Sequence, residues 1–253
     1  MTKCTERTAP VEFRETTLSC FEVEDFYGDG CIKEYVGAKE GRVLIPSCID
    51  GKKVIRIGDG VFAGCSSLSG ITISEGVEFI GSDAFCCCKS LTSIIIPDSV
   101  RAIHECAFYR CESLTGVTIP SGVVMIGDRA FRHCKSLTDI TLSDGLKSIC
   151  GWAFSDCASL PSVTIPDSVE MIGNWAFYGC GSLTNITIPE SVTVIGEGAF
   201  ANCKGLTGIA IPSSVEVIAD DAFEGCKHLT IHAPVGSPAE RYAKGNGIPF
   251  LPL

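Results

Sequence analysis

The sequence has no run of about 18 apolar residues, the length from which a membrane-spanning helix is predicted. No apolar stretch follows the first few residues, so we expect no secretory signal peptide. Basic residues are outnumbered, with 20 Lys and Arg against 30 Asp and Glu, and the formal net charge is −10. This deficit argues against binding to nucleic acid or to an anionic membrane surface, because both need clustered positive charge.

Catalytic signatures are also missing. The four histidines, His104, His133, His228 and His232, occupy four different positions of the repeat described below and form no cluster. A nucleophilic pair such as Cys106 with His104 would need an orienting third group and an oxyanion site, and the sequence shows neither. We therefore expect no enzyme activity and no cofactor.

Most of the chain consists of a 23-residue repeat marked by phenylalanine, with a Cys three residues and a Leu six residues after each Phe. The phenylalanines are Phe62, Phe85, Phe108, Phe131, Phe154, Phe177, Phe200 and Phe223. The cysteines of this ladder are Cys65, Cys88, Cys111, Cys134, Cys157, Cys180, Cys203 and Cys226. A fixed period of this length indicates stacked units, each of which buries its apolar face against its neighbours.

Each repeat contains three apolar segments, illustrated here by one copy. Residues 91–96 predict a short strand with Leu and Ile pointing inward, and Pro97 ends it because proline cannot donate to a strand ladder. Residues 100–103 predict a second inward-facing strand. Residues 107–111 have helical spacing, so we expect a single helical turn or a short 3₁₀ piece there. The predicted fold class is an α/β repeat, a solenoid of about eight rungs.

The repeat also divides the chain. Residues 62–232 form the repeats, and residues 28–61 are expected to form an N-terminal cap and half-repeat. Residues 1–27 carry no repeat and are expected to form an N-terminal arm, while residues 233–253 are expected to form a C-terminal cap that completes the solenoid.

Both caps have local signals. Residues 31–36 and 42–46 are β-rich runs separated by a glycine-containing segment, which predicts a β-hairpin that shields the first rung. Ser237 at the N-cap and Pro238 at the first helical position predict a short C-terminal helix, with Gly245 and Gly247 after its last turn.

The sixteen cysteines do not favour a disulfide scaffold, because the eight outside the ladder follow no spacing. The ladder thiols are expected to be free and to pack as small hydrophobes, since stacked rungs hold them slightly too far apart for disulfide geometry. Cys86, Cys87 and Cys88 could suggest a metal site, but adjacent cysteines on one turn are expected to diverge, and Cys88 belongs to the ladder. We therefore predict no metal site.

The outward face of the first strand is small and hydroxylated, with Thr118, Thr141, Thr164 and Thr187 in successive copies. Such an array could bind ice or carbohydrate, whereas the simpler interpretation is the preference of threonine for exposed strands. An acidic residue follows most of these strands: Glu75, Asp98, Asp144, Asp167 and Glu190. Calcium binding is disfavoured because each rung supplies one carboxylate and no ligand loop is present.

Aromatic and basic residues gather in the middle copies. Two residues before each Phe, the row is Gly60, Asp83, Cys106, Arg129, Trp152, Trp175, Gly198 and Asp221. The polar members of this row imply an outward-facing position, yet two adjacent copies carry Trp. Our candidate partner-binding residues are Tyr109, Arg110, Arg129, Arg132, Trp152, Trp175 and Tyr178, since Trp, Tyr and Arg dominate interface hot spots. In the alternative, Trp152 and Trp175 stack on each other, Arg129 lies over Trp152 as a cation–π pair, and nothing else binds.

The repeat pattern Leu-x-x-Ile-x-Ile-Pro-x-Ser-Val-x-x-Ile-Gly-x-x-Ala-Phe-x-x-Cys resembles the BspA-like (Treponema pallidum type) leucine-rich repeat family. Residues 172–180 match its signature closely, and residues 45–54 and 239–244 resemble its caps. The likeness covers residues 28–253. It implies a right-handed leucine-rich-repeat solenoid, no enzyme activity, and a role like that of bacterial or protist surface proteins that adhere to host or extracellular proteins.

We therefore expect a non-enzymatic protein-binding module, either adhesin-like or a scaffold, with a protein partner. The alternatives are a structural repeat protein without a specific partner, and carbohydrate or other ligand binding on the Thr/Ser-rich strand face. The missing signal peptide and the free cysteines favour the cytoplasm, whereas the resemblance implies the cell surface or secretion.

Overall fold

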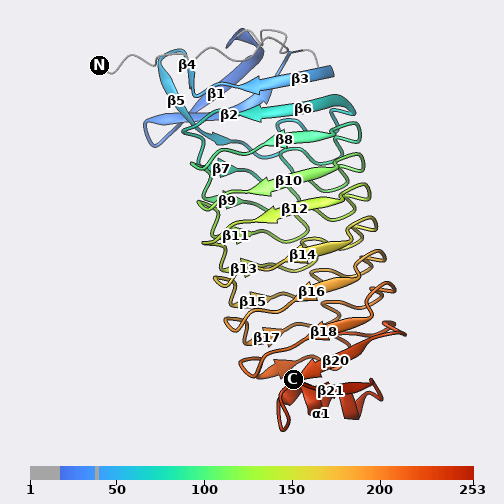
Figure 1. Ribbon diagram of the computed structural model, residues 1–253. Coiled ribbons are helices and arrows are strands. Elements are labelled where there is room, and N and C mark those ends of the chain that lie inside the picture. The colour runs from blue at the N-terminus through green and yellow to red at the C-terminus, as the bar shows by residue number, and fades with distance from the viewer. Residues whose placement is uncertain (1–17, 38–39) are drawn as a thin grey trace.

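The computed structural model describes residues 18–37 and 40–253, which form an elongated solenoid (Figure 1). Each coil has three sides: a strand, a second and shorter strand, and a turn segment. We define the turn segment as the residues from two before to three after each repeat Phe. Successive coils stack along the long axis, so equivalent residues of neighbouring repeats lie next to each other.

One sheet runs along the whole solenoid, in the order β1-β2-β5-β7-β9-β11-β13-β15-β17-β19, with β4 beside β5. Its strands are β1 (Phe21–Phe26), β2 (Asp29–Tyr35), β4 (Cys48–Ile49), β5 (Lys52–Ile57), β7 (Phe79–Ile80), β9 (Ala102–Ile103), β11 (Met125–Ile126), β13 (Ser148–Ile149), β15 (Met171–Ile172), β17 (Val194–Ile195) and β19 (Val217–Ile218). From β5 to β19 the pairing is parallel and in register, as where Ile103 lies opposite Ile126.

The longer strands of each coil form two five-stranded sheets that follow one another along the other side of the solenoid (Figure 1). The first consists of β3 (Glu40–Ile45), β6 (Ser67–Ile73), β8 (Ser93–Ile95), β10 (Gly116–Ile119) and β12 (Asp139–Leu142). The second consists of β14 (Ser162–Thr164), β16 (Asn185–Thr187), β18 (Gly208–Ala210), β20 (Thr230–Ala233) and β21 (Phe250–Pro252). Side chains alternate, so one face of each strand supplies the core and the other carries the threonines.

The core is a continuous apolar column in which every repeat supplies the same positions. The prediction that each repeat buries its apolar face is confirmed: the phenylalanines from Phe62 to Phe200 are fully buried, and Phe223 is 3% exposed. Their rings stack nearly parallel, with adjacent centroids 5.0 to 5.5 Å apart. Tyrosines close the stack at both ends, Tyr35 against Phe62 and Tyr242 against Phe223.

The turn segments contain the expected i→i+3 hydrogen bonds, for example from the Cys111 N–H to the Phe108 carbonyl at 3.2 Å. They do not continue as a helix, because Cys106 and Arg110 on either side of Phe108 have φ of 55° and 57°. A left-handed residue at each flank turns the chain back on itself, which is incompatible with a right-handed helix.

Peptide groups of the turn segments also form hydrogen bonds between coils, and in each case the N–H of one coil donates to a carbonyl of the following coil. The Phe108 N–H donates to the Ala130 carbonyl at 2.7 Å, while the Ala107 carbonyl accepts from the Phe85 N–H at 2.8 Å. The peptides two residues before and two residues after each Phe repeat this arrangement along most of the solenoid. We call these three rows of bonded peptides the peptide columns.

The N-terminal hairpin has different strands from those predicted. β2 pairs antiparallel with β1, across a turn at Tyr27 and Gly28, and not with β3. Instead β2 lies beside β5 in the long sheet and β3 lies beside β6, so the two predicted hairpin strands belong to different sheets. Of the N-terminal arm expected at residues 1–27, residues 1–17 lie outside the described part of the chain.

The C-terminal helix α1 (Pro238–Gly245) begins as predicted. The Ser237 side chain accepts a hydrogen bond from the Glu240 N–H at 3.2 Å, and Pro238 occupies the first turn. A strand that we did not predict, β21, follows the helix and pairs parallel with β20. Among the described residues no helix has both the length and the apolar character needed to cross a bilayer.

Candidate binding surface

The position two residues before each repeat Phe is left-handed in seven coils. Its φ lies between 53° and 68° whether the residue is Gly, Asp, Cys, Arg or Trp. Glycine adopts this conformation freely, whereas a bulky side chain does so at a cost of about 1–2 kcal/mol. Trp152 and Trp175 stand there with φ of 60° and 55°, and both side chains are half-buried on the outside of the coil.

The two indoles form the centre of a stack. Their ring centroids are 4.7 Å apart with an interplanar angle of 20°. The Arg132 guanidinium lies over the Trp152 ring at 4.5 Å, so Trp152 is held between a cation and the other indole. Trp175 in turn covers Gly198, where an added Cβ would lie 2.4 Å from the indole. Tyr178 flanks the stack, with its ring 6.0 Å from that of Trp152.

Arg129 does not lie over Trp152, so that part of the packing alternative is wrong. Its guanidinium instead forms an ion pair with Glu105 of the preceding coil at 3.0 Å. The indole of Trp152 is therefore reached by Arg132, which follows Phe131, and not by Arg129, which lies two residues before Phe131.

Tyr109 and Arg110 extend the surface toward the N-terminus. The Arg110 guanidinium lies 5.4 Å from the Tyr109 ring, and the Tyr109 ring meets His133 edge-on at 5.7 Å. We call the seven candidate residues the aromatic–basic patch. The structure brings six of them into one region of adjoining coils and turns the Arg129 side chain toward Glu105.

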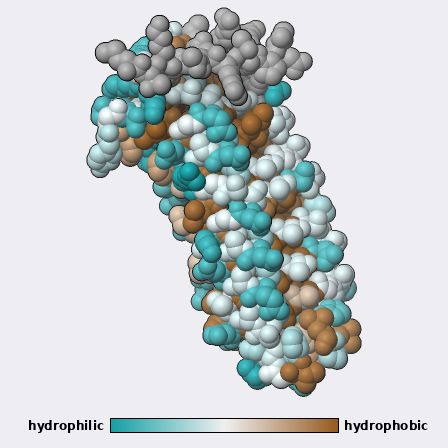
Figure 2. Space-filling view, turned by 60° about the vertical axis from the view of Figure 1, so that its left-hand side comes forward, coloured by the Kyte–Doolittle hydropathy of each residue, from teal (hydrophilic) through white to brown (hydrophobic). Residues whose placement is uncertain are grey.

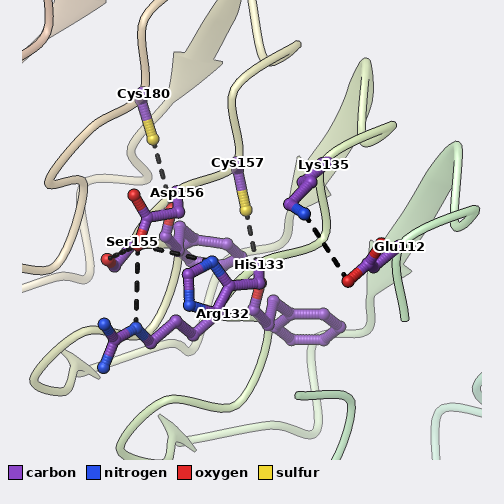
Figure 3. A network of polar contacts seen from close by, with 10 residues as sticks. Glu112, Arg132, His133, Lys135, Ser155, Asp156, Cys157 and Cys180 are labelled. Atoms are coloured by element: carbon purple, nitrogen blue, oxygen red, sulfur yellow. Dashed lines mark hydrogen bonds and ion pairs between the residues drawn. The ribbon is translucent and has the colours of Figure 1, made fainter. Parts of the chain in front are cut away.

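The Asp156 carboxylate lies between the side chains of Arg132 and His133, and we did not predict its role from the sequence (Figure 3). Its Oδ2 accepts a hydrogen bond from Ser155 Oγ at 3.0 Å and lies 3.7 Å from Arg132 Nε. It also lies 3.5 Å from His133 Nδ1. Asp156 could have been found from the repeat, because it occupies the same position as His133 one coil later.

Burial lowers the pKa of His133 below its ordinary value, and the nearby Asp156 acts in the opposite direction. His133 is therefore neutral at neutral pH, and Asp156 interacts chiefly with Arg132. This leaves Arg110 as the exposed cation of the patch. The region offers flat apolar area with guanidinium donors at its rim, which suits binding.

Elsewhere the exposed apolar side chains are scattered. Ile95, Met125, Met171 and Val217 are at least 40% exposed and lie on different coils. On the face shown in Figure 2, hydrophobic residues form separate small areas among pale and hydrophilic ones. The sheet that contains β16, β18 and β20 bears an open depression of about 420 Å³ near the C-terminal end, lined by Thr187, Gly208 and His232 among others.

The ladder cysteines are buried and form no disulfide, as expected, and those from Cys88 onward also make hydrogen bonds that we did not predict. Each thiol from Cys88 to Cys226 donates to the carbonyl of the Phe 26 residues earlier, as from Cys157 to Phe131 at 3.3 Å (Figure 3). Burial raises the pKa of Cys157 well above its usual range. These cysteines are therefore core donors as well as small hydrophobes.

The expectation that adjacent cysteines diverge is wrong for one pair. Cys88 points into the core, but Cys86 Sγ and Cys87 Sγ lie 3.5 Å apart at the surface. They are consecutive residues of a turn that closes from the Cys88 N–H to the Phe85 carbonyl, and this turn brings their side chains together. Within residues 18–37 and 40–253 no group of three metal-binding side chains converges.

Comparisons with known proteins agree with this geometry. The sequence profile of the BspA-type leucine-rich repeat region matches residues 45–135 and 103–230, in six copies. A search of curated proteins found no match.

Solved structures include several similar solenoids. A leucine-rich repeat protein of T. pallidum is 27% identical over 94% of this chain and 98% of its own, with a TM-score of 0.66. The pneumococcal vaccine antigen PcpA is 15% identical over 92% of this chain and 96% of its own, with a TM-score of 0.52. A leucine-rich cell surface protein of Faecalibacterium prausnitzii is 25% identical over 96% of this chain and 94% of its own, with a TM-score of 0.45. Because the profile covers well over half of the sequence and the coils carry its repeat, the chain belongs to the BspA-type leucine-rich repeat family.

Proposed function

We propose that this protein is a non-enzymatic protein-binding repeat protein that engages a protein partner through the aromatic–basic patch. The observation that carries the proposal is the placement of Trp152 and Trp175 at half-buried, left-handed positions on the outside of two adjacent coils. The protein would act as an adhesin or a scaffold. The core of each coil would serve to hold the patch residues in place.

The two tryptophans make stabilising contacts but stand at positions with a conformational cost. Their stacking contributes roughly 0.5–1.5 kcal/mol and the Arg132 cation–π contact about 0.5–1 kcal/mol. Against this, two bulky residues at left-handed positions cost about 1–2 kcal/mol each relative to the glycine that occupies the site in other coils. Burial of part of each ring adds a further gain, so the fold accommodates both indoles, and the exposed part of each ring remains available to a partner.

Their chemistry supports a protein partner. Trp, Tyr and Arg are the residues on which most interface binding energy falls, particularly when they cluster and are already ordered. Here Arg132 and Trp175 hold Trp152 in place before any partner arrives, so little side-chain entropy would be lost on binding.

The test compares wild-type protein with Trp152→Ser/Trp175→Ser as immobilised bait in the same protein extract. A matched control is Met125→Ser/Met171→Ser, which removes two exposed apolar side chains from β11 and β15 on another side of the solenoid. We expect partners captured by the wild type and by the methionine variant to be lost from the tryptophan variant, while circular dichroism shows that both variants remain folded. Equal capture by both double variants would contradict the proposal.

Fluorescence gives an independent measurement, because Trp152 and Trp175 are the only two tryptophans in the chain. A partner that covers the patch should protect this emission from acrylamide quenching. A captured protein that leaves the quenching unchanged binds elsewhere, and the patch would then have no part in its recognition.

A further inference from the structure

Cys86 and Cys87 form a pair of thiols on the outside of the solenoid, away from the aromatic stack. Their Sγ atoms are 3.5 Å apart, and both residues are half-buried. On the preceding coil, Gly64 occupies the position equivalent to Cys87 and has no side chain. A Cβ added at Gly64 would meet nothing within 4 Å, so the space next to the pair is open on that side. The pair can therefore be reached by a small molecule.

The backbone holds this pair rigidly. The peptide between Cys86 and Cys87 belongs to one of the peptide columns: its carbonyl accepts from the Gly64 N–H at 2.7 Å, and its N–H donates to the Tyr109 carbonyl at 2.7 Å. Hydrogen bonds on both sides prevent the peptide from rotating without breaking two coil-to-coil contacts. The two sulfurs are therefore positioned before any ligand binds, which removes most of the ordering cost.

The same restraint disfavours a disulfide within the pair. Adjacent Cα atoms across a trans peptide are about 3.8 Å apart, whereas disulfides usually span about 4.4–6.8 Å between Cα atoms. Closing the bond would require twisting the peptide that the column fixes. The pair is thus kept as two neighbouring thiols.

We propose that Cys86 and Cys87 form a chelating dithiol site for organic trivalent arsenicals, in which one arsenic atom bridges the two sulfurs. With an arsenoxide, R–As=O, the two thiols form two As–S bonds, the As=O bond is lost, and both thiol protons leave with the oxygen as one water molecule. Arsenic stays trivalent and keeps its carbon substituent, so no oxidant or reductant takes part.

Two features favour this class of ligand over a bare metal cation. A structural metal ion takes about four ligands, and no third metal-binding side chain converges with the pair within the described residues. Burial, followed by the hydrogen bond to Cys87, raises the pKa of Cys86 to about 12. A cation must displace that proton into solution, whereas the arsenoxide removes it as water.

The test uses phenylarsine oxide and the full-length protein under reducing conditions. By intact mass spectrometry the wild type should retain one arsenical in the presence of excess glutathione, a monothiol, and release it to dithiothreitol. Cys86→Ser and Cys87→Ser should each weaken retention by about a hundredfold or more, since one-point attachment loses the gain from intramolecular chelation. The control variant Cys106→Ser/Cys150→Ser removes two half-buried cysteines outside the pair and should retain the arsenical as the wild type does.

A second measurement needs no variant. In wild-type protein loaded with phenylarsine oxide, Cys86 and Cys87 should be protected from N-ethylmaleimide, while Cys106 and Cys150 remain reactive. Protection of any other pair, retention by either single variant, or failure of the wild type to retain the arsenical would overturn the proposal.

Discussion

At the scale of single residues, the backbone conformation at the position two before each Phe does not depend on which side chain stands there. Peptide-column hydrogen bonds fix a positive φ there, and the side chain faces outward, so Asp83, Cys106, Arg129 and Trp152 all occur in the same conformation. The fold therefore sets where a residue is displayed and leaves its chemistry open. Because the conformation is the same for different residue types, two tryptophans can occupy this position in adjacent coils.

The buried ring of each repeat has no such freedom. Phe131→Ala should lower the free energy of unfolding by about 3–5 kcal/mol, because the ring is fully buried and stacked between Phe108 and Phe154. Urea unfolding followed by circular dichroism would measure this loss. Met125→Ala on an exposed strand is the control and should change stability by no more than about 0.5 kcal/mol. A loss below about 1 kcal/mol at Phe131 would contradict the core assignment.

Burial at these positions was predictable from the sequence, whereas the contacts of long side chains were not. The 23-residue period alone places Phe131 and its neighbours inside. It does not say whether Arg129 or Arg132 reaches the Trp152 ring, because both lie on the outside and the choice depends on how each side chain leans between coils. Asp156 attracts Arg132 and Glu105 attracts Arg129, and neither pairing follows from the repeat.

At the scale of elements, the ladder of thiols adds a pH dependence to the solenoid. Burial raises the pKa of Cys134, Cys157 and Cys180 well above 9.0, their ordinary value. Below that pH both the folded and the unfolded chain keep these protons, so stability is undiminished. As pH rises further, the unfolded chain ionises first and the free energy of unfolding should fall.

Urea unfolding at about pH 8 and about pH 10 would measure this fall. Cys134→Ala/Cys157→Ala should be less stable at the lower pH but should lose less on going to the higher one. An equal loss in wild type and variant would assign the pH dependence to other groups.

The caps show where element-level reasoning succeeds and fails. Ser237 and Pro238 specify a helix start through local hydrogen bonding, so the sequence was sufficient. Residues 31–36 and 42–46 were paired as a hairpin because a glycine-rich segment joins them. Residues 31–36 instead pair with β1 and β5, and residues 42–45 pair with β6. The pairings with β5 and β6 join strands that are distant in sequence and are set by coil geometry.

At the scale of the whole molecule, each coil contacts chiefly its two neighbours, so complete coils should be removable. Deleting residues 109–131, one full repeat, joins Phe108 to Arg132 and keeps every later Cys and Leu in register. We expect a shorter solenoid that unfolds cooperatively at lower temperature, as measured by circular dichroism. Deleting one residue fewer, 110–131, shifts Cys134 off the ladder and should prevent folding. Equal folding of both deletions would show that the repeat register does not determine the structure.

The one-way peptide columns give the turn-segment side of the solenoid an electrical polarity. Peptide dipoles that point the same way add, as in an α-helix, but here the chain of dipoles runs between coils and parallel to the solenoid axis. Its N–H end, the positive pole, lies at the last turn segment, where Asp221 and Glu224 supply negative charge beside Phe223. The turn-segment side therefore has unlike ends, and one end favours anionic side chains for the same reason that a helix N-terminus does.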